Sequence, residues 1–290
     1  MNLATYHIRG RQSFGVVVGD GVVDLRPRLA PRLTSVLDVL RAGALAEVEK
    51  TVAGVRPDFP LSEAELLLPV PGGEKILCIG VNYANRDAEL TQAGGNTEAK
   101  YPSMFFKPPN SFVPHNAPVL RPSESEQLEY EGEICLVIGK TARRVPKDKA
   151  LDCVAGITMC NEGTIRDWIR HGRFNVTQGK AWDSTGSMGP WMTTGVDLKK
   201  PLHIVCKLNG EVTQDDTSDH MIFGFVDILS YVSTFMTLKP GDIICTGTPT
   251  KLNQKEGERK WLEAGDAFEM HVPEIGTLRN VVKDESALAV

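Results

Sequence analysis

Glu131 and Glu133 stand at alternate positions directly before the apolar run 134–138. In a β-strand, side chains two positions apart point to the same face, about 6–7 Å apart along the backbone. The run has no polar alternation, which is typical of a strand covered on both faces. Two carboxylates at the start of such a strand are costly unless a cation neutralises them. The segment therefore predicts a buried strand with a cation site at its entrance, and a solvated strand edge is the alternative.

A third acid, Glu162, lies in a segment that predicts a strand running into a helix over 164–171. Asn161 or Thr164 would cap this helix and Gly172 would end it. An acid at such a turn either joins the two glutamates or interacts with the helix dipole, and spacing leaves both interpretations open. If the three acids converge, an all-oxygen ligand set without clustered cysteine or histidine favours Mg²⁺, Mn²⁺ or Ca²⁺ over zinc.

The remaining pattern predicts a β-rich α+β protein with a small N-terminal α+β domain, residues 1–72, and a larger domain, residues 73–290. Prolines and glycines punctuate the chain between them. In the first domain we expect strands at 4–9, 13–18 and 21–25 and a helix over 33–53. In the second we expect strands at 75–80, 103–107, 131–138, 155–160, 203–208, 242–246 and 267–272, a type I′ hairpin at Asn209-Gly210, and peripheral helices at 83–93, 164–171 and 222–236.

Charge and cysteine usage limit the partners and the compartment. The net charge is −5 and the basic residues are scattered, which argues against nucleic acid as a partner. No apolar run is long enough to span a bilayer and the N-terminus lacks a signal-peptide pattern, so we expect a cytoplasmic protein without a membrane partner. The six cysteines sit singly in apolar segments, as expected of buried thiols in a reducing compartment.

Eight or more short motifs occur in one order along residues 74–285, and together they resemble the fumarylacetoacetate hydrolase family. Single motifs are weak evidence, whereas their common order is specific. They are CIGVNYA at 78–84, FFKP at 105–108, YEGE at 130–133, NE at 161–162, RDW at 166–168, 180–191 with GPW at its end, NGE at 209–211, SD at 218–219, MIF at 221–223, KPGD at 239–242, TGTP at 246–249 and GTLRN at 276–280.

The resemblance implies the β-roll or sandwich of that family with peripheral short helices, a homodimer, and a Mg²⁺ or Mn²⁺ site used on small oxo-acids. It places Glu131, Glu133 and Glu162 on the metal ligands. It implies catalytic roles for Lys180, Glu89 and Arg166, with Lys180 orienting water or stabilising an enolate. It implies substrate contacts for Thr248 and Lys107, and we expect Arg86, which could hold a distal carboxylate, and Tyr83 to contact the substrate as well.

Two residues depart from the family pattern. Glu162 stands where the family usually has aspartate, so the metal must shift by about an ångström, or the carboxylate must fold back or bind through both oxygens. On the lid segment, Glu89 is present, but Arg86 replaces the histidine of the family's His-x-x-Glu pair. Arginine cannot act as a base at neutral pH. The departure at 86 therefore counts against water-activated hydrolysis.

The leading functional prediction is a divalent-metal-dependent hydrolase that cleaves C–C bonds of β-dioxo acids of the acylpyruvate or fumarylpyruvate type. The first alternative is a metal-dependent decarboxylase, isomerase or hydratase of 2-oxo dicarboxylic acids in aromatic catabolism, which needs only a Lewis acid and a proton shuttle. The alternative from another class is a non-catalytic protein that binds an oxo-acid through a metal.

Overall fold

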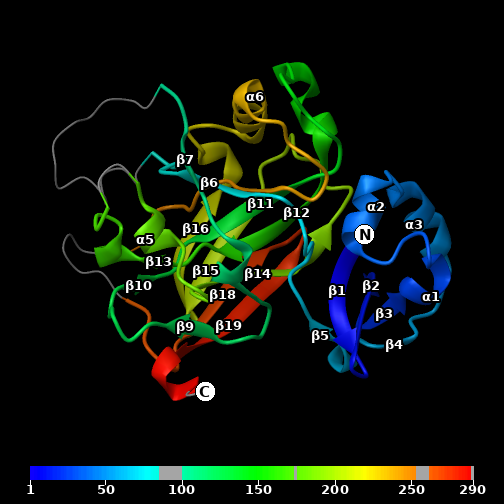
Figure 1. Cartoon of the computed structure of the whole chain (residues 1–290), viewed down its shortest axis with the longest axis horizontal. Helices are drawn as coiled ribbons and strands as arrows, with labels where there is room; N and C mark the ends of the chain where they lie inside the picture. Colours follow the sequence, from blue (N-terminus) through cyan, green and yellow to red (C-terminus); the bar gives the residue numbers. More distant parts are fainter. Residues whose placement is uncertain (85–99, 173–174, 253–260, 289–290) are drawn as a thin grey trace.

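The computed structural model describes residues 1–84, 100–172, 175–252 and 261–288. Two large β-sheets, one two-stranded sheet and short helices outside them form this part (Figure 1). The larger sheet has 12 strands in the order β4 (Phe59–Pro60), β3 (Gly21–Asp24), β2 (Arg11–Val18), β1 (Asn2–Ile8), β14 (Gly186–Thr193), β12 (Val154–Asn161), β11 (Gly132–Ile138), β17 (Ile243–Cys245), β6 (Ile76–Gly80) and β7 (Ser103–Phe106), with β5 (Glu65–Leu66) on β1 and β8 (Phe112–Pro114) on β14.

The smaller sheet has five strands, in the order β16 (Glu211–Thr217), β15 (His203–Leu208), β18 (Ala267–Val272), β19 (Gly276–Asp284) and β9 (Val119–Arg121), and β10 (Leu128–Glu129) pairs separately with β13 (Thr164–Ile165). The predicted hairpin is confirmed: Asn209 and Gly210 have φ of 52° and 86° between β15 and β16, as a type I′ turn requires. The β-rich α+β class is confirmed as well.

The strand β11 lies between β12 and β17, and all seven of its residues are buried. Ile134 and Leu136 join the core between the two sheets, where they share a cluster with Ile204 of β15. Val137 belongs to a second core on the other face, which includes Leu3 of β1. The prediction of a strand covered on both faces is therefore confirmed, and it explains why the run does not alternate.

The helices are short: α1 (Arg26–Leu29), α2 (Val36–Arg41), α3 (Leu45–Val52), α5 (Thr177–Lys180) and α6 (Phe225–Phe235). The helix predicted over 33–53 is interrupted, because Gly43 has φ of 62° between α2 and α3. The helix predicted over 164–171 is wrong, since that segment forms β13 and the 3₁₀ turn η4 (Arg166–Trp168). The helix predicted over 83–93 lies almost wholly outside the described residues. None of the helices in the described ranges has the length and apolarity to cross a membrane.

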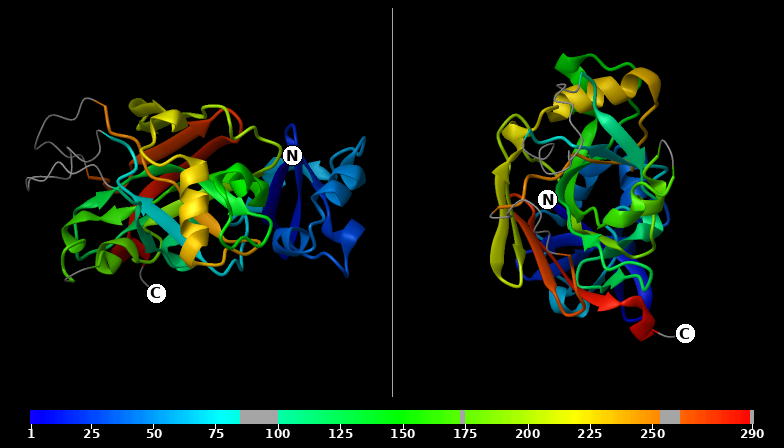
Figure 2. Two further views of the ribbon diagram at one scale, coloured as in Figure 1. Left: turned by 90° about the horizontal axis from the view of Figure 1, so that it is seen from above. Right: turned by 90° about the vertical axis from the view of Figure 1, so that its left-hand side faces the viewer.

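The N-terminal elements lie at one end of the molecule, far from β10, β13 and α5 (Figures 1 and 2). They are also part of the larger sheet, because β1 pairs antiparallel with β14 through Asn2↔Thr193 and Leu3↔Met192. The boundary at residue 72 stays a prediction, and a hydrogen-bonded sheet crosses from one proposed domain to the other.

Ser35 caps α2: its backbone is extended (φ −151°, ψ 163°) and its hydroxyl accepts a 3.0 Å hydrogen bond from the Asp38 amide. Replacing Ser35 with alanine is expected to lower the free energy of unfolding by about 1 kcal/mol, because the amide loses its partner. Urea unfolding measures this change, and Ser35→Thr, which keeps a capping hydroxyl, is the control. An unchanged midpoint in Ser35→Ala would show that the cap contributes nothing.

Candidate metal centre and cavity

The three predicted carboxylates meet where β11 begins and β12 ends. These strands are antiparallel, with Gly132 opposite Asn161, and the Glu162 amide donates a 2.7 Å hydrogen bond to the Glu131 carbonyl. One carboxylate oxygen from each of Glu131, Glu133 and Glu162 lies within 4.8 Å of the others, and all three residues are buried. No helix follows Glu162 directly, so its carboxylate faces the two glutamates and not a helix end.

Lys180, the last residue of α5, inserts its ammonium group among these carboxylates. Its Nζ donates to Glu131 Oε2 at 2.5 Å, to Thr164 Oγ1 at 2.7 Å and to Glu162 Oε2. Burial lowers the pKa of Lys180, but the charges of Glu131 and Glu162 outweigh this and raise it above its usual value. The lysine is therefore cationic in the metal-free protein.

Arg166, in η4, contacts the same cluster from the other side. Its Nη2 lies 2.8 Å from Glu131 Oε1, and its Nε donates to Glu129 Oε2 at 2.6 Å. Glu129 was not predicted as a site residue, although it continues the alternation of acids that Glu131 and Glu133 begin. The signal that could have identified it is the third acid at an alternate position of the same strand pattern.

Lys107 lies beneath Glu162 and does not reach the cavity lined by described residues. Its side chain is fully buried, and its Nζ donates to the carbonyl oxygens of Glu162 and Gly163, both at 2.6 Å, and lies 3.0 Å from Glu162 Oε1. The expectation that Lys107 faces the substrate is corrected accordingly. Because one ammonium group contacts both the carbonyl and the carboxylate of Glu162, the longer side chain folds back toward its own backbone.

The donor set fits a hard divalent cation. Burial, reinforced by the charges of Glu162 and Glu131, raises the pKa of Glu133 well above its usual value, although the Gly247 amide and the charge of Lys180 act in the opposite direction. Glu162 Oε1 is buried and accepts no well-directed hydrogen bond from the described residues, although Lys107 is near. Three converging carboxylates, one with an oxygen lacking a hydrogen bond, are suitable ligands for Mg²⁺, Mn²⁺ or Ca²⁺.

The carboxylates open into a cavity of about 850 Å³. Thr248 lines it, and Gln214 Nε2 donates a 2.9 Å hydrogen bond to the Thr248 hydroxyl. Arg170, which sequence reasoning did not single out, also lines it. The wall combines charged groups on one side with apolar side chains elsewhere, among them Ile79, Met104, Phe105, Ile169 and Val176.

Of the other predicted site residues, one is described and two are not. Tyr83 is buried, pairs as an isolated bridge with Met221, and is absent from the described cavity lining. Arg86 and Glu89 lie outside the described residues, so their roles stay predictions.

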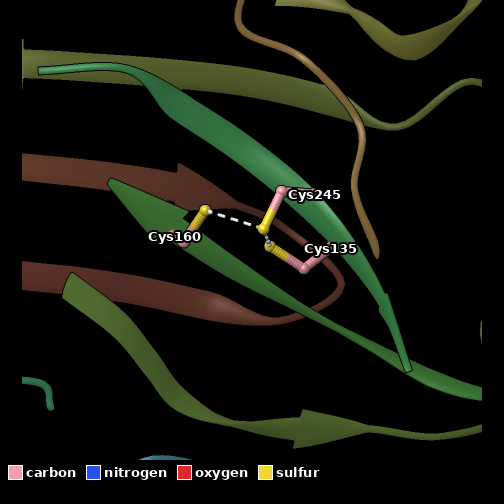
Figure 3. Close-up of side chains that lie close together, drawn as sticks. All are labelled: Cys135, Cys160 and Cys245. Atoms are coloured by element: carbon pink, nitrogen blue, oxygen red, sulfur yellow. Dashed lines mark hydrogen bonds between the residues drawn. The ribbon is translucent and has the colours of Figure 1, made fainter. Parts of the chain in front are cut away.

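A group of thiols packs behind the carboxylates. Cys245 Sγ lies 3.6 Å from Cys135 Sγ and 3.7 Å from Cys160 Sγ, with the three cysteines on neighbouring strands (Figure 3). Burial raises the pKa of Cys160 well above its usual value, as it does for Cys135. All six cysteines are free and buried, in agreement with the prediction of buried thiols.

Comparison with known proteins identifies the class to which this fold and carboxylate cluster belong. The model of the fumarylacetoacetate (FAA) hydrolase C-terminal family matches residues 75–283. The chain is a member of this family.

Its relatives differ in reaction. A mitochondrial oxaloacetate tautomerase of Rattus norvegicus is 32% identical over 270 residues, which cover 91% of this chain and 85% of the relative. The 4-hydroxyphenylacetate degradation bifunctional isomerase/decarboxylase of Salmonella dublin is 35% identical over 222 residues, covering 76% of this chain and 49% of that protein. The structure of maleylpyruvate hydrolase from Sphingobium sp. SYK-6, in complex with manganese(II) and pyruvate, superposes with a TM-score of 0.77 at 27% identity, covering 98% and 99% of the two chains. The family therefore includes tautomerases, isomerases, decarboxylases and hydrolases.

Proposed function

We propose that this protein is a divalent-metal-dependent enzyme that moves a proton at the carbon beside the keto group of a 2-oxo acid, as in keto–enol tautomerisation or isomerisation. The observation that supports this most is the Lys180 ammonium at the cavity wall between two carboxylates. No histidine occurs among the described residues that line the cavity. Proton transfer by lysine needs no water-activating histidine, whereas hydrolysis needs a group that activates water.

Glu131, Glu133 and Glu162 would hold the ion, Mg²⁺ or Mn²⁺, with Ca²⁺ compatible with the same oxygen ligands. A bound divalent ion supplies Lewis-acid stabilisation of the negative charge that develops on an enolate oxygen. The manganese and pyruvate in the similar maleylpyruvate hydrolase structure support this assignment.

The protein's own groups then bind and orient the substrate. Lys180 holds a proton and a positive charge at the base of the cavity, within reach of an oxygen or carbon placed above the carboxylates. The Thr248 hydroxyl and the Arg166 guanidinium can hydrogen-bond a substrate carboxylate, and arginine does so with two parallel bonds. Phe105 and Ile169, on the apolar wall, limit water near the reacting atoms.

The charge of the site favours a dianionic substrate. In the described cluster, three carboxylates are offset by three cations, so adding a divalent ion leaves two excess positive charges. Two carboxylates on one small substrate would restore neutrality, which is the state that a buried site favours. The groups counted are Glu131, Glu133 and Glu162 against Lys107, Arg166 and Lys180.

A second candidate is hydrolysis of the C–C bond in acylpyruvates, the leading prediction from the sequence. The similarity to maleylpyruvate hydrolase favours it. It requires a base for water, and the predicted candidate, Glu89, lies outside the described residues. Both proposed functions include the homodimer that the family resemblance implies and the cytoplasmic location that the sequence pattern predicts.

The test is to assay oxaloacetate tautomerisation and acylpyruvate cleavage with the same preparation. We expect tautomerisation to disappear with EDTA and to return with Mn²⁺ or Mg²⁺, and to exceed cleavage. Cleavage faster than tautomerisation would favour the hydrolase. Neither reaction, with an oxo-acid still bound, would favour the non-catalytic binding protein. The variant Glu89→Gln separates the two enzymes further, because loss of cleavage alone marks Glu89 as the hydrolytic base.

A further inference from the structure

A buried ion pair lies outside the carboxylate cluster and the cavity lining. Lys251 Nζ lies 2.8 Å from Glu129 Oε1, and the exposed fractions of the two side chains are 2% and 1%. The ammonium group also lies 4.1 Å from the centre of the Tyr130 ring, a distance typical of a cation–π contact. The two charged residues are 122 positions apart in the chain.

Each partner is attached to a residue of the cavity. The second oxygen of Glu129 accepts the 2.6 Å hydrogen bond from Arg166 Nε, so one carboxylate contacts both Lys251 and Arg166. Lys251 follows Thr248 by three residues, and Gln214 Nε2 donates to both the Thr248 hydroxyl and the Pro249 carbonyl. Glu129 thus links Arg166 in η4 to the segment 248–251, and both Arg166 and Thr248 line the cavity.

Because the Glu129–Lys251 pair is buried, its main contribution is not expected to be stability. Removing two charges from water is costly, and a well-packed apolar pair of similar size is often as stable or more so. A buried pair is better suited to fixing direction, because hydrogen bonds hold both oxygens of Glu129 in place. The guanidinium that Glu129 Oε2 holds is the one whose Nη2 lies 2.8 Å from Glu131 Oε1.

We propose that Glu129 and Lys251 are positioning residues: together they fix Arg166 and the Thr248 segment in the arrangement that receives a substrate carboxylate. The proposal rests on the proposed function for its ligand, a small oxo-acid anion. Glutamine at 129 keeps one accepting oxygen and replaces the other with a donating NH₂ group, so one of the two cations loses its acceptor and faces a donor.

The experiment measures binding of oxalate, an oxo-acid mimic, to the Mn²⁺-loaded protein by calorimetry, together with KM and kcat. We expect Glu129→Gln and Lys251→Met to raise the oxalate Kd and KM about tenfold, while kcat changes less and Mn²⁺ affinity stays within a factor of about two. Lys251→Arg, which keeps the charge, should recover most of the binding. Glu129→Asp keeps the buried negative charge on a side chain that is one methylene shorter. It should also raise the oxalate Kd, and it disturbs the fold less than Glu129→Gln.

Lys75 and Asp242 provide a matched control, because they form a 2.7 Å ion pair in which Asp242 is buried, at residues outside the cavity lining. Lys75→Met should lower the unfolding midpoint and leave the oxalate Kd unchanged. If the variants at 129 and 251 lower only the midpoint, as Lys75→Met does, the positioning role is overturned. It is also overturned if the wild-type protein does not bind oxalate. A protein that binds oxalate in a Glu129-dependent way but turns over no oxo-acid would instead refute the proposed function alone.

Discussion

The variant Glu133→Gln is expected to lose Mn²⁺ binding and to lower kcat/KM by about 10³-fold or more, because loss of Lewis-acid stabilisation removes several kcal/mol from the transition state. In the metal-free protein the same change is expected to raise the free energy of unfolding. Burial raises the pKa of Glu133 and disfavours its charged form, so a neutral amide of the same shape relieves that cost. The Gly247 amide keeps an acceptor, since glutamine retains one oxygen.

Manganese binding followed by electron paramagnetic resonance, kinetics with oxaloacetate, and urea unfolding in EDTA measure the three effects. The control is Glu269→Gln in β18, where the carboxylate pairs with Arg279 at 3.2 Å and does not line the cavity. This control should bind Mn²⁺ as the wild type does. Retention of full Mn²⁺ affinity by Glu133→Gln would remove Glu133 from the ligand set.

The variant Lys180→Met is expected to reduce kcat by about 10²–10⁴-fold, the usual contribution of a positioned acid or base. Manganese affinity should be retained or increased, because the ammonium group and the ion compete for Glu131 and Glu162. In the metal-free protein the variant leaves both carboxylates without their shared cation. We therefore expect a loss of about 3–5 kcal/mol in unfolding free energy, as for other broken buried ion pairs.

Adding Mn²⁺ should restore most of the stability of Lys180→Met but none of its activity, and this combination separates a chemical role from a structural one. Urea unfolding with and without Mn²⁺, beside steady-state kinetics, provides both readings. Arginine at 180 is the comparison, since it keeps the charge but cannot release a proton at neutral pH. Activity in Lys180→Met equal to that of the wild type would show that proton transfer uses another group.

Much of the fold could be predicted because its signals are local. Alternation and its absence identified β11, and Asn209-Gly210 identified the β15–β16 hairpin, since each depends on residues a few positions apart. The segment 164–171 was predicted wrongly as a helix because its structure depends on a contact with a distant segment. Its residues Thr164 and Ile165 pair with Glu129 and Leu128 of β10, a contact that no local pattern encodes.

The site shows the same division. Glu131 and Glu133 could be paired from spacing alone, because two positions along a strand determine a shared face. Spacing left Glu162 undecided between the glutamates and a helix end, and the pairing of β11 with β12 decided it. The position of Lys107 likewise depends on tertiary contacts. Lys107 directly follows β7, and its ammonium group contacts Glu162, which lies 55 positions further along the chain.

The sequence by itself determined a strand buried on both faces and membership of the fumarylacetoacetate hydrolase family, and it predicted three carboxylates suited to a hard cation. Only the tertiary structure decided which charges meet. Glu129 joins Arg166 and Lys251, and Lys180 joins Glu131 and Glu162, through contacts between distant segments. The reason is physical, because local spacing sets the direction of a side chain, whereas the cost of burying a charge depends on partners that only the folded chain supplies.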